Sequence, residues 1–132
     1  MKEYSDILIN DDFGSFDISD EAVIEYNKRL LEKNPDAKPI QQYSLLRRHD
    51  PILIEVYHSL GERINNECSY IELYKIPTKY INHYRIDECD GKEFIIILYD
   101  KYKVDMIDVV LNASDLSDRE RMIAIRKIMA LE

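Results

Sequence analysis

The sequence predicts an α+β fold in which a small, mostly antiparallel sheet with a central Asp-Gly hairpin packs against three to four helices. Three observations support this class. Apolar residues recur at helical spacing near both ends of the chain, β-branched residues concentrate in its middle, and Asp90-Gly91 separates two strand-like runs. The length of 132 residues suits a single domain over residues 1–132.

The first third of the chain predicts a strand, a helix and a connection. Residues 4–10 form an apolar run that ends at acidic turn residues. Ser19 can cap a helix over residues 20–33, and Pro35 ends it because proline lacks an amide donor and disfavours helix in the residue before it. A connection without periodicity follows over residues 34–46. The apolar stripe of the helix consists of Ala22, Val23, Tyr26 and Leu30.

A second helix is predicted to begin at Asp50-Pro51. The carboxylate of Asp50 can cap the helix, and proline suits the first helical position because its missing donor has no partner there. Gly61 ends this helix, or the helix continues to Ile64 before a turn. Its apolar stripe consists of Leu53, Val56, Tyr57 and Leu60.

The middle of the chain predicts three strands. The first covers residues 70–76 and stops at a proline, and the other two cover residues 81–89 and 92–99. The last two strands flank Asp90-Gly91. We expect a two-residue hairpin turn there, because both residues tolerate the positive φ that such a turn requires. The unbroken apolar run over residues 95–98 predicts a central strand that is covered on both faces. The turn sets the register by pairing Ile86 with Ile95 and Tyr84 with Ile97.

The last third of the chain predicts one or two helices. Residues 103–111 fit a helix by their spacing and a strand by their β-branched content, and we favour the helix. Ser117 and Glu120 form a capping box that opens a helix over residues 117–131. We expect its apolar face to be buried on the sheet or across a homodimer, since closed pairs are the commonest assembly. That face consists of Met122, Ile125, Ile128 and Met129.

Composition and charge argue against several classes of protein. The net charge of −8 and the pI of about 4.9 oppose nucleic-acid binding, which depends on basic patches. The longest apolar run, residues 94–99, is too short to span a membrane, and the amino terminus lacks a secretory signal. Cys68 and Cys89 are too few for a disulfide framework and have no neighbouring base in the sequence. We therefore expect structural free thiols and a cytoplasmic location.

Several short motifs follow one another in a recognisable order. They are Phe13-Gly14-Ser15-Phe16, Ser19-Asp20-Glu21-Ala22, Arg48-His49-Asp50-Pro51, Leu60-Gly61-Glu62, Ile76-Pro77 and Asp90-Gly91-Lys92-Glu93-Phe94. Over residues 4–99 this order resembles a family of small uncharacterised proteins of phages and large DNA viruses. Ser15 and Phe94 replace a Gly and a Trp of the family, Tyr99-Asp100 replaces His-Arg, and residues 100–132 form an extension. The resemblance implies a viral or phage origin, the host-cell cytoplasm and no particular reaction.

Two loops offer candidate binding residues. Residues 11–15 follow a strand and precede a helix, where carboxylates can bind a divalent cation and helix amides an anion. We favour the alternative that they form a turn anchored in the core by Phe13 and Phe16. Arg47 and Arg48 can bind phosphate or carboxylate, and we favour instead an ion pair with Asp50 or another surface acid. The candidate residues are Asp11, Asp12, Phe13, Gly14, Ser15, Arg47, Arg48 and Asp50.

The sequence carries no recognisable catalytic or metal-binding motif, and we predict no catalytic residue, no cofactor and no metal. The three histidines, at positions 49, 58 and 83, lack ligand spacing. We therefore predict a non-enzymatic protein-binding or host-interaction protein. The alternative is a nucleotide-like small-ligand binding or sequestering protein, or a small enzyme, with a site built from loops near Asp11 and Asp50. A deep pocket there favours the alternative, and a flat exposed apolar patch favours protein binding.

Overall fold

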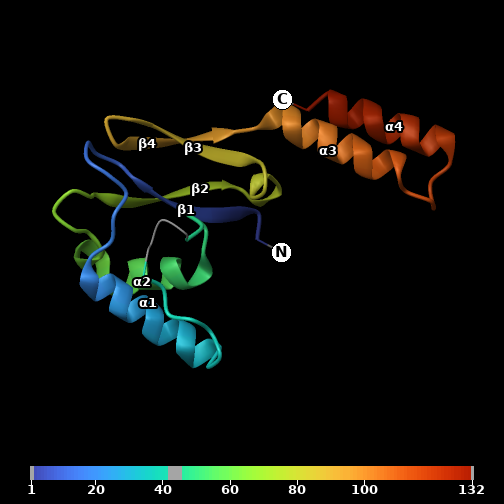
Figure 1. Ribbon diagram of the computed structural model, residues 1–132. Helices are drawn as coiled ribbons and strands as arrows, with labels where there is room; N and C mark the ends of the chain where they lie inside the picture. The colour runs from blue at the N-terminus through green and yellow to red at the C-terminus, as the bar shows by residue number, and fades with distance from the viewer. Residues whose placement is uncertain (1, 42–45, 132) are drawn as a thin grey trace.

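The computed structural model describes residues 2–41 and 46–131 and has the predicted α+β fold, with antiparallel strands. Two helices lie on one face of a first two-stranded sheet, and a second two-stranded sheet lies on the other face (Figure 1). A helical hairpin at the carboxyl end projects to one side of these layers. The elements are β1 (Tyr4–Asn10), α1 (Asp20–Lys33), α2 (Pro51–Leu60), the 3-10 helix η2 (Gly61–Ile64), β2 (Ile71–Pro77), the 3-10 helix η3 (Thr78–Tyr80), β3 (Tyr84–Cys89), β4 (Lys92–Ile97), α3 (Tyr99–Leu111) and α4 (Asp118–Met129).

The first two helices begin at the predicted caps. The Ser19 hydroxyl accepts a hydrogen bond from the amide of Ala22, and the Asp50 carboxylate accepts bonds from the amides at the start of α2. The sequence predicts two alternative carboxyl ends for α2, and each is partly right. The α-helix stops at Gly61, and a 3-10 turn continues to Ile64. The predicted connection over residues 34–46 is irregular as far as it is described, and its residues 42–45 lie outside the described chain.

β1 and β2 form the first sheet, which separates the two halves of the core. Successive residues of a strand point to opposite faces. Leu8 therefore packs with α1 and α2, while Ile7 and Ile9 pack against the second sheet. These three side chains are essentially inaccessible to solvent. The helix-side core consists of Leu8, Ile18, Ala22, Tyr26, Leu53, Val56, Ile64 and Ile71, and the other half of Ile7, Ile9, Ile76 and Tyr80.

β3 and β4 form the second sheet around the predicted Asp90-Gly91 turn. Asp90 has φ of 51° and Gly91 has φ of 86°, as a two-residue hairpin turn requires. The predicted register is confirmed, because Ile86 pairs with Ile95 and Tyr84 pairs with Ile97.

The expectation of one sheet with a central strand over residues 95–98 is wrong. β4 pairs only with β3 among the described strands, so it is an edge strand of a separate sheet. The apolar run of β4 has two faces with different surroundings. Ile95 and Ile97 pack toward the first sheet, whereas Phe94 points to the outer face and stays 46% exposed.

The carboxyl-terminal residues form a helical hairpin. The ambiguous residues 103–111 are helical, within an α3 that begins at Tyr99, and α4 opens with the predicted capping box of Ser117 and Glu120. The expected burial of the α4 face on the sheet is wrong, because α4 packs along α3 instead. Met122 and Met129 are 55% and 65% exposed. None of the helices over the described residues has the length and apolar character needed to traverse a bilayer.

Candidate functional site

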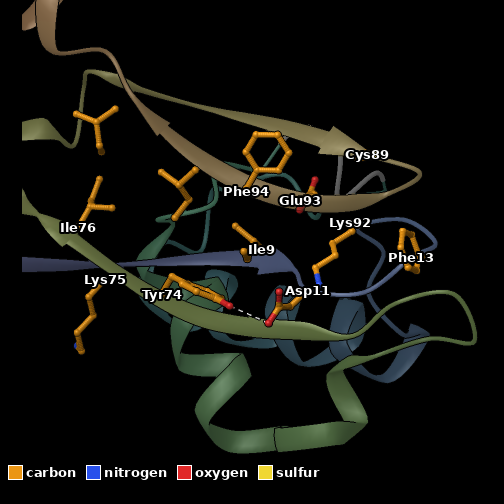
Figure 2. A pocket seen from close by; sticks show the side chains of 12 residues that line it. Ile9, Asp11, Phe13, Tyr74, Lys75, Ile76, Cys89, Lys92, Glu93 and Phe94 are labelled. Carbon is orange, nitrogen blue, oxygen red and sulfur yellow. Dashed lines mark hydrogen bonds between the residues drawn. The ribbon is translucent and has the colours of Figure 1, made fainter.

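A cleft of about 560 Å³ opens between the two sheets and is the clearest candidate site. β4 lies above it and β2 below it, and Ile9 of β1 lies between them (Figure 2). Most of its walls are apolar side chains, and four charged residues join them. The lining residues are Ile9, Asp11, Phe13, Tyr74, Lys75, Ile76, Cys89, Lys92, Glu93, Phe94, Ile95 and Ile97.

The strand above the cleft exposes one edge of its backbone. His83 and Leu98 continue the β3–β4 ladder, and the amide of Leu98 donates to the carbonyl of His83. Hydrogen-bonding direction alternates along a strand, so the even-numbered residues of β4 face β3. The amides and carbonyls of Glu93, Ile95 and Ile97 therefore point away from β3. Within the described residues none of these six backbone groups has a hydrogen-bond partner.

The first sheet is only partly covered at this edge. β4 lies over β1, because a carboxylate oxygen of Glu93 accepts a 2.8 Å bond from the amide of Asn10 and the inward isoleucines of β4 pack on those of β1. β2 is the outer neighbour of β1, and its Tyr74 side chain on the same face is 42% exposed. The open edge of β4 thus adjoins an uncovered part of the first sheet.

An ion pair behind the cleft holds the two sheets and the loop before α2 together. Arg48 binds both carboxylate oxygens of Glu93, and the Nη2–Oε2 distance is 2.7 Å. Glu93 is 9% exposed, while the Arg48 side chain is 21% exposed. The Arg48 guanidinium also lies 3.6 Å from the centre of the Phe16 ring. This bidentate, stacked geometry is one that lysine does not reproduce.

A tyrosine and an aspartate occupy the lower rim of the cleft. The Tyr74 hydroxyl donates a 2.8 Å hydrogen bond to Asp11, drawn as a dashed line in Figure 2. This bond, followed by burial, raises the pKa of Tyr74 above its ordinary value, so the hydroxyl stays protonated at neutral pH. The rim therefore presents a neutral donor that is already paired with a carboxylate.

The structure divides the predicted loop residues 11–15 between different surroundings. Asp11 and Phe13 line the cleft, and the Asp12 carboxylate accepts a bond from the next amide. Gly14 and Ser15 donate amide bonds to the carbonyls of Asp90 and Cys68. The expectation that Phe13 anchors the loop in the core is wrong, because Phe13 is 65% exposed, whereas Phe16 does pack against the core.

The second group of predicted residues does not join Asp11. Arg48 pairs with the buried Glu93 and not with Asp50 or a surface acid, which corrects the favoured alternative. Asp50 caps α2 and accepts a 2.9 Å bond from the Tyr26 hydroxyl. Arg47 is exposed beside a shallow hollow next to β3. Within the described residues, Asp50 is thus not among the side chains that line the cleft beside Asp11.

The histidines and cysteines lie in separate places. His49 shares a 2.7 Å hydrogen bond with the Tyr84 hydroxyl, and burial, then the charge of Arg47, lowers the pKa of His49. His83 lies 2.6 Å from Asp105. Both cysteines are free and exposed, so neither packs in the core as a structural thiol. Over residues 2–41 and 46–131 no three His, Cys, Asp or Glu side chains gather as metal ligands do.

Sequence reasoning missed the residues that shape the cleft. The sequence places Tyr74, Ile95 and Ile97 in strands without indicating a binding role, and it shows Glu93 only within a motif. One signal was available. An acidic residue within a predominantly apolar strand needs a buried partner, and Arg47 and Arg48 are candidate cations before a capped helix. The open edge of β4 had no such signal, because it depends on how two hairpins stack.

The comparisons with known proteins give no relative. No protein-family model, no curated protein and no solved structure matches this chain. The resemblance to phage and viral proteins therefore stays a prediction.

Proposed function

We propose that the protein binds an extended, mainly apolar segment of a partner protein, which adds as a strand to β4 and fills the cleft. The observation that carries this proposal is the unpaired backbone edge of Glu93, Ile95 and Ile97 above the uncovered face of β2. Strand addition is a general mode of peptide recognition, in which main-chain hydrogen bonds supply affinity and pockets for alternate side chains supply specificity.

The cleft suits the alternate side chains of an added strand. Such a strand lies beside β4, so every second side chain points down toward β2. There it meets Ile9, Tyr74 and Ile76, and the partner segment completes the cover of the first sheet. Lys92 and Asp11 line the cleft, so residues of either charge at the ends of the segment find a counterpart, whereas Lys75 points away from the cleft in Figure 2 and pairs with Asp6.

The polar groups of the cleft favour binding over catalysis. Tyr74 is bonded to Asp11, and Glu93 is bonded to Arg48 and to the Asn10 amide. Groups that satisfy one another in this way hold the walls in place and are not themselves available as an acid–base pair for a reaction. The exposed thiols of Cys68 and Cys89 support the cytoplasmic location that belongs to this proposal, because a reducing compartment keeps thiols free.

A second candidate function is the binding of a small apolar ligand in the same cleft. Its volume of about 560 Å³ falls within the range of small-molecule sites, roughly 300–1,000 Å³. A nucleotide-like ligand is less well supported, since Arg48 and Asp50 are engaged elsewhere. A small ligand needs only the apolar walls, whereas a strand also needs the amides of β4, and this difference separates the two candidates.

The test selects binders from a displayed library of random peptides and measures their affinity for two variants at one position. Ile95→Ala removes most of the side chain, while Ile95→Pro removes in addition the outward amide. Proline is tolerated at an outward edge position because the β3–β4 ladder does not use that donor. We expect Ile95→Pro to weaken the best peptide at least tenfold more than Ile95→Ala, with similar circular dichroism and melting for both.

Two further measurements complete the test. Tyr74→Lys should weaken the peptide, whereas Tyr70→Lys, which replaces a tyrosine of similar exposure outside the cleft, should not. Hydrogen exchange at Glu93, Ile95 and Ile97 should slow when the peptide binds. Equal affinity for both Ile95 variants, with unchanged exchange, contradicts strand addition. Saturable binding of an apolar dye that Tyr74→Lys abolishes, without any selected peptide, supports the second candidate instead.

A further inference from the structure

The α3–α4 hairpin exposes a second apolar surface, away from the cleft. The two helices pack on each other, yet neither contains a buried residue. Their half-buried side chains lie where they meet, with Met106 and Val110 on α3 and Ala124 and Ile128 on α4. The first turns of α3 adjoin the rest of the molecule (Figure 1). There Tyr99 and Tyr102 pack on Tyr80. A helical hairpin of this size is marginal in water without a further surface to pack on.

Four strongly exposed apolar side chains lie on one side of the hairpin. Val104 and Leu111 are two turns apart on α3, and Met122 and Met129 are two turns apart on α4. Measured around the helix axis, each pair lies about 110° from the side of its helix that packs on the other helix. The direction of this rotation, viewed from the amino end of each helix, is the same for α3 and α4. Because the helices face each other and run antiparallel, equal rotations bring both pairs to the same side. All four side chains are 55–65% exposed.

The opposite side of the hairpin is more polar. By the same helical geometry it carries Asp105, Glu120 and Lys127, together with the exposed Val109 and Ile123. Asp105 contacts His83 in the body of the protein. The apolar face therefore points away from the body and is accessible to a partner.

The charges that border the apolar face differ between its two edges. Asp100 and Asp108 lie beside the α3 pair, and Arg119 and Arg126 lie beside the α4 pair. All four side chains are exposed, and none forms an ion pair in the part of the chain that the structure describes. One edge is thus acidic and the other basic, which makes the face complementary to a copy of itself.

We propose that this face is a self-association surface, on which two copies of the chain pair as a four-helix bundle. A two-fold axis parallel to the helices places α3 of one subunit against α4 of the other, so that every neighbouring pair of helices is antiparallel. The same operation brings Asp108 to the level of the partner's Arg119 and Asp100 to the level of the partner's Arg126.

The area of the face agrees with a pair of this kind. α3 has 13 residues and α4 has 12, which gives a length of about 18–20 Å, and two packed helices are about 20 Å wide. Two such faces cover roughly 700–800 Å² together, somewhat less than the roughly 1,000 Å² of a stable specific interface, which agrees with a weak pair. The dimer is therefore expected to be reversible and concentration-dependent.

The test measures the mass of the full-length protein by light scattering over a concentration series. Met122→Glu places a charge on the proposed interface, while Ile123→Glu places one on the opposite side at a position of comparable exposure. We expect wild type and Ile123→Glu to dimerise and Met122→Glu to raise the dissociation constant at least tenfold. Both substitutions are at exposed positions, so circular dichroism should show the same helix content for all three proteins.

A charge exchange tests the arrangement of the two subunits. Asp108→Arg should weaken the dimer, and Asp108→Arg combined with Arg119→Asp should restore it, since the swapped charges again face each other. A protein that stays monomeric up to about 1 mM overturns the proposal. So does a dimer that Met122→Glu leaves unchanged. A dimer that Met122→Glu breaks but that the charge exchange fails to restore overturns the parallel two-fold arrangement.

Discussion

Removing Arg48 alone from the Arg48–Glu93 pair should lower the free energy of unfolding far more than removing both charges. Arg48→Met removes the cation but keeps an unbranched side chain over Phe16. It leaves a carboxylate that is 9% exposed with only the amide of Asn10 as a partner. Breaking a buried ion pair on one side costs about 3–5 kcal/mol, because the remaining charge is desolvated and uncompensated.

Removing the charge of Glu93 instead should lower the free energy of unfolding by a smaller amount. Glu93→Gln keeps the shape of the side chain and its bond to the Asn10 amide, and the Arg48 side chain, 21% exposed, still reaches water. We expect a loss of about 1.5–3 kcal/mol, the value of a hydrogen bond to a charged group. The double variant Arg48→Met/Glu93→Gln buries no charge, so it should be more stable than Arg48→Met alone.

Urea denaturation followed by circular dichroism measures these differences. With a slope of about 1–3 kcal/mol per molar urea, Arg48→Met should lower the midpoint by about 1–5 M. The exposed pair of Lys33 and Glu55 serves as the control, and Lys33→Met should shift the midpoint far less than Arg48→Met. Strictly additive effects of Arg48→Met and Glu93→Gln, or a loss at Arg48 no larger than at Lys33, refute the reasoning.

Three further predictions follow from the turns, the histidines and the ligand-type side chains. Gly91→Ala should lower the free energy of unfolding by more than about 2 kcal/mol, because the added carbon would lie 1.6 Å from the Gly14 carbonyl oxygen. Gly61→Ala, where the added carbon meets open space, should lower it by about 1 kcal/mol. Equal melting temperatures of the two variants contradict this prediction. Acidification from about pH 7.5 to 5.5 should lower the free energy of unfolding. Burial lowers the pKa of His49 in the folded protein, so the unfolded chain, with a His pKa of about 6.5, takes up the proton at a higher pH and is favoured as the pH falls. His49→Gln should flatten this profile and His58→Gln should not, and an unchanged slope in urea midpoints argues against it. Elemental analysis of protein purified without a chelator should find no stoichiometric transition metal, and a one-to-one content of zinc overturns this expectation.

Local features of the fold were predictable because their causes lie close together in the sequence. Ser19, Asp50 and Ser117 cap helices within three residues of their own positions. The Asp90-Gly91 turn likewise dictates the β3–β4 register without help from the rest of the chain. Such signals act over one turn, so each identifies an element and one of its ends.

The candidate site was not predictable to the same degree, since it depends on contacts between distant segments. The partner of Arg48 lies 45 positions further along the chain, and nothing between them indicates the pairing. The apolar run of β4 is equally compatible with a central strand and with an edge strand. Only the stacking of one hairpin on the other determines that its outer edge stays open.

The pairing of β1 with β2 has a consequence for the order in which the chain folds during synthesis. Residues 11–70 separate the two strands, so β1 has no partner until β2 has been synthesised. At about 5–20 residues per second, translation of this interval takes about 3–12 s. During that time Ile7, Leu8 and Ile9 form a nascent apolar strand without its sheet, and the emerging chain is then most exposed to chaperones and to aggregation.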